Sequence, residues 1–273
     1  MKFDGILICT DLDGTLLKND HTVSEENLRA IEYFKSEGGK FTFITGRMPY
    51  FSRSIKDVIK PNAPVGCVNG GGIYDYDKEE YVSLLTLPDD VADLVIEVAE
   101  HVEGIGVVVN TPNTLYFPYD NAATVRHRAR TKMEYQACDL RNFTETIAKI
   151  VFADMREEAI EKAAAFLNSH KRADEFGFIR SERTLYEILP KGISKGTLLS
   201  RLAEHLGIDM KKTVAVGDYN NDVSMIAAAG VGVAVANAVP EAKAVAKHIT
   251  VSNEEHAIAR IISDIEEGLI SFS

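Results

Sequence analysis

The sequence lacks any apolar run long enough to cross a membrane. No run reaches the roughly 18–20 residues of a membrane-spanning helix. The first residues read MKFDGILICTDLDG, and Asp4 and Asp11 interrupt what would be the hydrophobic part of a signal peptide. We therefore expect a protein with no membrane segment and a cytoplasmic location.

Cysteine is scarce as well. The 273-residue chain has three cysteines, Cys9, Cys67 and Cys138, and their spacing is not that of a zinc site. Cys9 and Cys67 lie in apolar, strand-like runs, so we interpret them as reduced core residues. This cysteine usage fits a cytoplasmic protein.

Positive charge is in deficit, with a formal net charge of −11 at pH 7. Such a chain would repel a polyanion, so we expect no nucleic-acid partner. It would also repel a phosphorylated metabolite, and a ligand of that kind would need cations placed close to it. Nothing in the sequence predicts an oligomeric state.

Short apolar runs alternate with helical patterns in two separate parts of the chain. Strand-like runs occupy residues 6–10, 41–45 and 65–68, and a helix with Ser24 as its N-cap lies between the first two. The same alternation returns after residue 190, with strands at 213–217 and 231–235. Strand–helix–strand order predicts an α/β fold with a parallel sheet.

The segment between these two parts has a different pattern. Residues 83–189 alternate single helices with several strands, which indicates an inserted α+β domain large enough for its own core. The predicted domains are therefore 1–82 with 190–273, and 83–189.

Polar residues follow each of four predicted core strands. Each alone is an ordinary turn residue, but ligands bind beyond the carboxyl ends of parallel strands, so four such ends together predict a binding site. These residues are Asp11 and Asp13, then Thr45, Gly46 and Arg47, then Asn69 with Gly70, and finally Asp218, Asn221 and Asp222.

Three of these carboxylates, Asp11, Asp13 and Asp218, should converge. Oxygen ligands with no histidine or cysteine nearby favour Mg²⁺ over zinc. A calcium loop of the EF-hand type does not fit. With Gly14 at its obligatory glycine, Cys9 would stand at the first aspartate position and Asp20 at the bidentate glutamate position.

Lys195 is a second indication of an anion site. Ser194 has the properties of an N-cap, which places Lys195 in the first turn of a helix. A cation there interacts unfavourably with the helix dipole, at a cost of roughly 0.3–1 kcal/mol, and an anion bound between the lysine and the helix terminus would remove that cost. A solvated surface lysine is the alternative.

These motifs together resemble the haloacid dehalogenase-like (HAD) superfamily of phosphohydrolases, which use an aspartate nucleophile. DLDGT at 11–15, Thr45 in TGR, Lys195 and GDYNND at 217–222 match its four motifs in order. The NGGG at 69–72 and the long insertion resemble the Cof-type subgroup. The resemblance implies a Rossmann-like core, a large α/β cap and small phosphorylated substrates, mostly sugar phosphates.

The resemblance also implies a role for each residue. Asp11 would be the nucleophile and Asp13 the general acid and base. Mg²⁺ would be held by Asp11, Asp218 and the backbone carbonyl of Asp13. The phosphate-binding residues would be Thr45, Gly46, Lys195 and Asn221. Asp222 would orient Lys195 or a water, and Arg47 and Asn69 are possible substrate contacts, with Arg47 alternatively pairing with a carboxylate.

The sequence departs from the family pattern near its end. Residues 252–258 read SNEEHAI, and His256 stands where the family usually has glycine, which puts the geometry of that loop in question. Asn237 follows a strand at the functional edge and is interpreted either as a turn residue or as part of the site. The cations of 124–132 indicate a solvated helix face or a contact for a second anionic group.

Three alternatives to a phosphatase remain. A sugar phosphomutase would share the aspartyl-phosphate intermediate. A non-catalytic phosphometabolite sensor would keep the fold, but it would have no need of a proton-transferring Asp13. A phospho-acceptor receiver domain also uses an acidic pocket with threonine and lysine, but receivers are only about 120 residues long and have no large cap.

Overall fold

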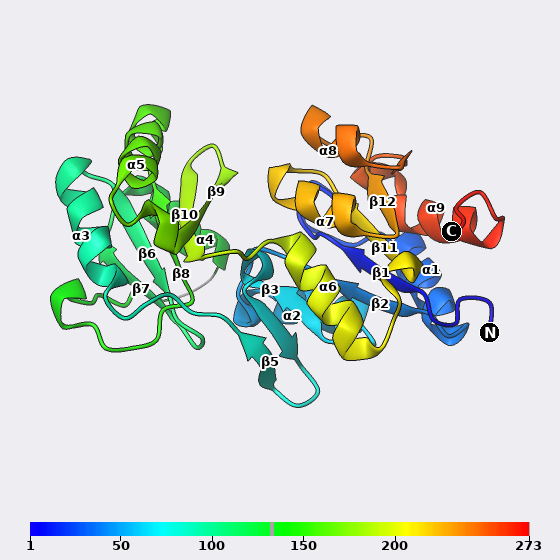
Figure 1. The fold of residues 1–273 in the computed structure, drawn as a ribbon. Helices are drawn as coiled ribbons and strands as arrows, with labels where there is room; N and C mark the ends of the chain where they lie inside the picture. The colour runs from blue at the N-terminus through cyan, green and yellow to red at the C-terminus, as the bar shows by residue number, and fades with distance from the viewer. Residues whose placement is uncertain (132–133, 273) are drawn as a thin grey trace. The chain divides into compact units, whose positions relative to one another are not determined.

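The computed structural model describes residues 1–131 and 134–272 and divides into two compact units (Figure 1). The core unit comprises Met1–Ser83 and Ser194–Ser273, and the inserted unit comprises Leu84–Ile193. The sequence-based boundaries lay at 82/83 and 189/190. Of the described helices, none is both long and apolar enough to span a bilayer.

The core unit is built on a parallel five-stranded sheet. β1 pairs with β11 on one side and with β2 on the other, so that Leu7 lies opposite both Thr213 and Lys40. The predicted α/β class is thereby confirmed. The strand order is β13 (His248–Ile249), β12 (Val231–Ala234), β11 (Thr213–Gly217), β1 (Leu7–Thr10) and β2 (Lys40–Phe43).

Alternate residues of the central strands enter different cores. Ile8 and Val214 belong to the cluster that includes the apolar sides of α1 (Glu25–Ser36) and α9 (Ala257–Glu266). Leu7 and Cys9 belong to the cluster on the opposite face, with α6 (Lys195–Leu206) and α7 (Val223–Ala228). The period of two places helices on both faces of the sheet. The three cysteines are free, and Cys9 and Cys67 are buried.

The helix ends follow from the residues at their caps. Ser24 Oγ accepts the N–H of Asn27 at the start of α1. Ser194 and Thr197 form a reciprocal capping box at the start of α6, and Gly207 ends α6 in the left-handed conformation. The remaining helices of this unit are α2 (Pro49–Ile59) and α8 (Pro240–Val245).

The segment 65–68, predicted as a strand of the parallel sheet, has a different role. β3 (Val65–Cys67) is joined to the residue after β2 by one isolated parallel bridge, between Ile44 and Gly66. It otherwise belongs to a three-stranded sheet with β4 (Gly72–Asp75) and β5 (Glu80–Leu84). Three successive residues with positive φ, Val68 to Gly70, reverse the chain so that β4 returns antiparallel to β3.

The inserted unit is an antiparallel sheet with helices on one face. α3 (Val91–His101) and α5 (Glu157–Ser169) pack on it, and a third helix, α4 (Ala122–Thr131), follows β7. Arg128 of α4 pairs with Asp120, whereas Lys132 lies outside the described residues. The strand order is β7 (Leu115–Tyr119), β6 (Gly106–Asn110), β8 (Lys149–Ala153), β10 (Leu185–Pro190) and β9 (Phe176–Glu182).

Candidate active site

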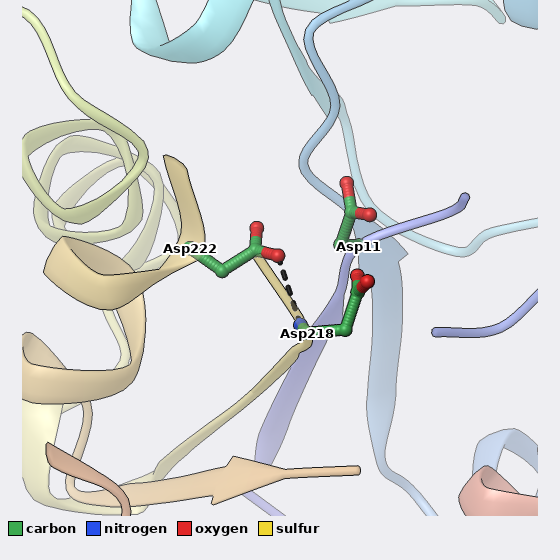
Figure 2. Close-up of side chains that lie close together, drawn as sticks. All are labelled: Asp11, Asp218 and Asp222. Carbon is green, nitrogen blue, oxygen red and sulfur yellow. Dashed lines mark hydrogen bonds between the residues drawn. The ribbon is translucent and has the colours of Figure 1, made fainter. Parts of the chain in front are cut away.

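Two neighbouring strands bring three carboxylates to one edge of the core sheet. Asp11 follows β1 and donates its N–H to Val216 O, which extends the pairing with β11 by one residue. Asp218 follows β11 directly, and Asp222 lies one short turn later. Each of the three offers a carboxylate oxygen within 4.8 Å of the others. Figure 2 shows them grouped at the ends of β1 and β11.

Lys195 is the cation of this cluster. It is 1% exposed, so the solvated surface lysine is excluded. Its Nζ donates to Asp11 Oδ1 at 2.5 Å and to Asp222 Oδ1 at 2.6 Å. Asp222 Oδ2 accepts the backbone N–H groups of Asp218 and Tyr219, and the bond to Asp218 is dashed in Figure 2. Both oxygens of Asp222 are therefore engaged, one by Lys195 and the other by backbone N–H groups.

Burial and mutual repulsion govern the protonation of the cluster. Burial raises the pKa of Asp11 well above its ordinary value, although Lys195 opposes the shift. Burial, and then the charge of Asp222, raise the pKa of Asp218 to about 6. Burial disfavours the charge of Lys195, but Asp11 and Asp222 outweigh it and raise the pKa of the lysine. Three carboxyl groups thus surround a single lysine in this cluster.

The residues at this edge fit a hard divalent cation. Asp11 and Asp218 supply carboxylate oxygens, the donor type such ions prefer. Gly14 keeps the approach to Asp218 open, because a Cβ at position 14 would stand 2.5 Å from Asp218 Oδ2. The acidic cluster could therefore hold a metal ion.

Neutralising Asp218 should change the pH dependence of stability in the metal-free protein. The folded-state pKa of about 6 lies above the ordinary 3.8, so the stability that protonated Asp218 contributes is lost as the pH rises through this window. The free energy of unfolding of Asp218→Asn should exceed that of the wild-type protein by about 1–2 kcal/mol at pH 7.5, and the two values should converge near pH 4. Urea unfolding in EDTA measures this. Asp4→Asn, at an exposed aspartate, controls for the lost charge, and parallel wild-type and Asp218→Asn curves would contradict the prediction.

Asp13 was expected to converge with Asp11 and Asp218, but Asp222 is the third carboxylate of the cluster, and the side chain of Asp13 pairs with Arg47 instead. Its side chain is 47% exposed. Arg47 donates from Nε to Asp13 Oδ2 at 3.0 Å and from Nη2 to Asp13 Oδ1 at 2.6 Å. The two-bond geometry fixes the plane of the carboxylate. Of the two predicted roles of Arg47, the structure shows the pairing with a carboxylate.

A backbone bond joins the turn after β2 to the reversal after β3, and a bond between side-chain amides joins that reversal to the turn after β11. Thr45 is buried, its carbonyl accepts the N–H of Asn69, and its Oγ1 accepts the N–H of Arg47. Asn221 Nδ2 donates to Asn69 Oδ1 at 3.2 Å. Gly46 is required here, because a Cβ would stand 2.7 Å from that same Asn69 oxygen. The structure thus brings the expected residues Thr45, Gly46, Asn69 and Asn221 together.

Two residues near the carboxylates had no predicted role. Thr15, fully buried, donates from Oγ1 to Asp218 Oδ1 at 2.8 Å. The sequence could have indicated Thr15, since it is the last residue of the DLDGT motif. His21 lies with Nδ1 3.6 Å from Asp13 Oδ1 and has positive φ, and nothing in the sequence pattern indicated that contact.

The departure from the family pattern at His256 leaves the backbone in a glycine-like conformation. His256 has φ 63° and ψ 50°, the left-handed region in which glycine is common. Its Nδ1 lies 3.6 Å from a Glu26 carboxylate oxygen. The loop at 252–256 therefore folds with histidine in the glycine position.

Comparison with known proteins decides the family. The model of the haloacid dehalogenase-like hydrolases matches residues 8–262. The chain belongs to this family. The family predicted from the sequence motifs is confirmed. The matched region of this HAD-like hydrolase includes residues Asp11 to Thr15 and Gly217 to Asp222.

Relatives of this HAD-like hydrolase are named phosphatases, which confirms the predicted enzyme class. It is 28% identical over 268 residues to 5-amino-6-(5-phospho-D-ribitylamino)uracil phosphatase YitU of Bacillus subtilis (strain 168), covering 97% of this chain and 98% of the relative. It is 32% identical over 273 residues to putative phosphatase YxeH of the same organism, covering 95% and 97%. A haloacid dehalogenase-like hydrolase from Bacteroides thetaiotaomicron has a similar crystal structure, with TM-score 0.85, 26% identity and coverage of 95% and 99%.

Proposed function

We propose that this HAD-like hydrolase is a Mg²⁺-dependent phosphatase of small phosphorylated metabolites, of the sugar-phosphate type, that works through an aspartyl phosphate. The observation that carries the proposal is the buried contact of Asp11 with Lys195, beside Asp218. An anionic nucleophile approaches an anionic phosphate only where positive charge offsets the repulsion. The YitU relative, whose named substrate carries a phosphorylated ribityl chain, supports the substrate class.

In the first step, Asp11 attacks phosphorus and the bond to the substrate's alcohol oxygen breaks. One oxygen of Asp11 is held by Lys195, which fixes the orientation of the carboxylate and brings a positive charge to the site. Asp11 and Asp218 would hold Mg²⁺ with the Asp13 carbonyl, and the ion would neutralise charge on the phosphoryl oxygens. The phosphoryl group would also contact Thr45, Gly46, Lys195 and Asn221.

Asp13 would carry the proton in both steps. It would protonate the leaving oxygen first, and then accept a proton from the water that hydrolyses the aspartyl phosphate. The pairing with Arg47 aims this carboxylate, and its exposure leaves it accessible to substrate and water. A non-catalytic sensor would have no use for this separately held carboxylate.

The requirement for Mg²⁺ can be tested directly. Release of phosphate from p-nitrophenyl phosphate should need Mg²⁺, stop with EDTA and return when Mg²⁺ is added in excess, because uncompensated carboxylates would repel the substrate. Full turnover in EDTA would refute the metal dependence. A labelled sugar phosphate separates hydrolase from mutase, since free phosphate indicates the former and an isomerised sugar phosphate the latter.

Asp13→Asn tests the division of roles between the two aspartates. The variant should lose turnover by about 10²–10⁴-fold, because the amide transfers no proton. It should keep its affinity for Mg²⁺, since the backbone carbonyl of residue 13 is unchanged. Steady-state kinetics and isothermal titration with Mg²⁺ measure the two quantities. A rate near wild type would contradict the acid–base assignment.

A further inference from the structure

The loop of residues 14–22, which follows the two aspartates, is irregular backbone, and local bonds such as Leu17 N–H to Leu12 O and Lys18 N–H to Thr22 O close its turns. Gly14 has φ 78°, and Asp13 forms an isolated bridge with Leu17. Gly14 has no side chain to pack, so the position of its peptide depends on hydrogen bonds to the backbone. Its two carbonyl groups at Gly14 and Leu17 both accept bonds from a distant part of the chain.

Two asparagines make those bonds, and we call Asn237 and Asn253 the asparagine clasp. Asn237 Nδ2 donates to Gly14 O at 2.8 Å. Asn253 Nδ2 donates to Leu17 O at 2.9 Å, and its backbone N–H donates to Asn237 Oδ1 at 3.1 Å. Asn253 is 3% exposed, so water competes little with its bonds. The clasp therefore holds the turn at both ends and links its own two members.

The same segments hold the rest of the loop and the neighbouring carboxylate. Glu254 accepts the N–H of Asn19, in the middle of the loop, at 2.7 Å. Thr15, inside the turn, bonds to Asp218. The N–H of Val239, two residues beyond Asn237, donates to the carbonyl of Asp218 at 2.8 Å. The loop and Asp218 are thus tied to the segment that carries Asn237.

We propose that the asparagine clasp is a positioning device for Asp13. Asp13 directly precedes Gly14, whose carbonyl is clasped, and it forms a backbone bridge with Leu17, whose carbonyl is the other one. Arg47 fixes the carboxylate at the other end of the side chain. Without the clasp the backbone of Asp13 would shift, and its carboxylate, together with the paired Arg47 side chain, would move relative to Asp11 and the substrate. This inference rests on the proposed acid–base role of Asp13.

The test compares two phosphates of similar size, p-nitrophenyl phosphate and benzyl phosphate. The nitrophenolate leaves without a proton, whereas benzyl alcohol needs one, so a defect in proton donation slows only the second. Asn237→Ala and Asn253→Ala should lower kcat/KM for benzyl phosphate about tenfold more than for p-nitrophenyl phosphate. Asn237 is exposed, so its variant should fold even if the Asn253 variant does not.

Asn62→Ala is the matched control. Asn62 also bonds two backbone groups, accepting from Phe41 and donating to Gly39, but at the opposite edge of the sheet. This variant should slow both substrates equally. Hydrogen exchange of the segment 13–22 adds a readout independent of activity, and the clasp variants, but not Asn62→Ala, should exchange faster there.

The possible outcomes separate this inference from the proposed function. Unchanged exchange in the clasp variants, or equal losses on both substrates, overturns the inference. Asp13→Asn is measured in parallel and should show the largest bias against benzyl phosphate. If Asp13→Asn shows no bias, the acid–base assignment fails, and so does the positioning role; faster exchange would then support the clasp only as a structural element of the loop.

Discussion

Asp11→Asn should reduce turnover by at least about 10⁴-fold, the scale expected when a nucleophile is removed. The amide is close in size to the carboxylate and can still accept the bond from Lys195, so the fold should survive. It cannot attack phosphorus, so no aspartyl phosphate forms. Kinetics with p-nitrophenyl phosphate measure the loss.

Trapping identifies the residue that carries the phosphoryl group. Rapid acid quenching with substrate should leave phosphate on the wild-type peptide that contains Asp11 and none on the Asp11→Asn peptide. Asp4→Asn is the control, because the same substitution is made at an exposed position before β1. A phosphorylated peptide from another part of the chain, or turnover preserved in Asp11→Asn, would overturn the assignment of the nucleophile.

Lys195→Met should destabilise the protein and abolish most of its activity. The substitution leaves Asp11 and Asp222 buried without their cation, and breaking a buried pair on one side costs about 3–5 kcal/mol. Turnover should fall by at least about 10²-fold, because the phosphoryl group loses a positive charge in the transition state. Urea unfolding at pH 7.5 and phosphate release measure the two effects.

Two controls for Lys195→Met distinguish the loss of a buried ion pair from the loss of a positive charge alone. Lys2→Met removes a lysine that pairs with Glu266 at the surface, where both side chains are over one third exposed, so its cost in stability should be far smaller than that of Lys195→Met. Adding Asp222→Asn to Lys195→Met should restore part of the stability but not the activity. A Lys195→Met protein as stable as wild type would contradict the buried ion pair.

The positions of the acidic residues could be predicted because local patterns report them. An apolar run marks a buried strand, and Asp11 and Asp218 follow two such runs directly. Parallel strands end at the same edge, so their meeting followed from the strand order. The first turn of α6 around Lys195 followed from Ser194 in the same way. These are short-range features, readable within a few residues.

The reversal of the chain from β3 into β4 could not be predicted in this way. The run at 65–68 is apolar enough for a central strand, yet the chain reverses at Val68 and Asn69 with positive φ. Valine rarely adopts that conformation, so the sequence predicted that the strand would continue through Val68. The reversal is stabilised by long-range bonds, among them Val68 N–H to Arg47 O.

The alternation of strands and helices, the acidic strand ends and the family resemblance could all be predicted from the sequence, because each depends on neighbouring residues. The tertiary structure decided the partners of those side chains: Arg47 with Asp13, Thr15 with Asp218, and the asparagine clasp with the loop at 14–22. Such pairings depend on strand register and on the paths of segments far apart in the chain. Asn253 and Leu17 are separated by 236 residues, and no local pattern joins them.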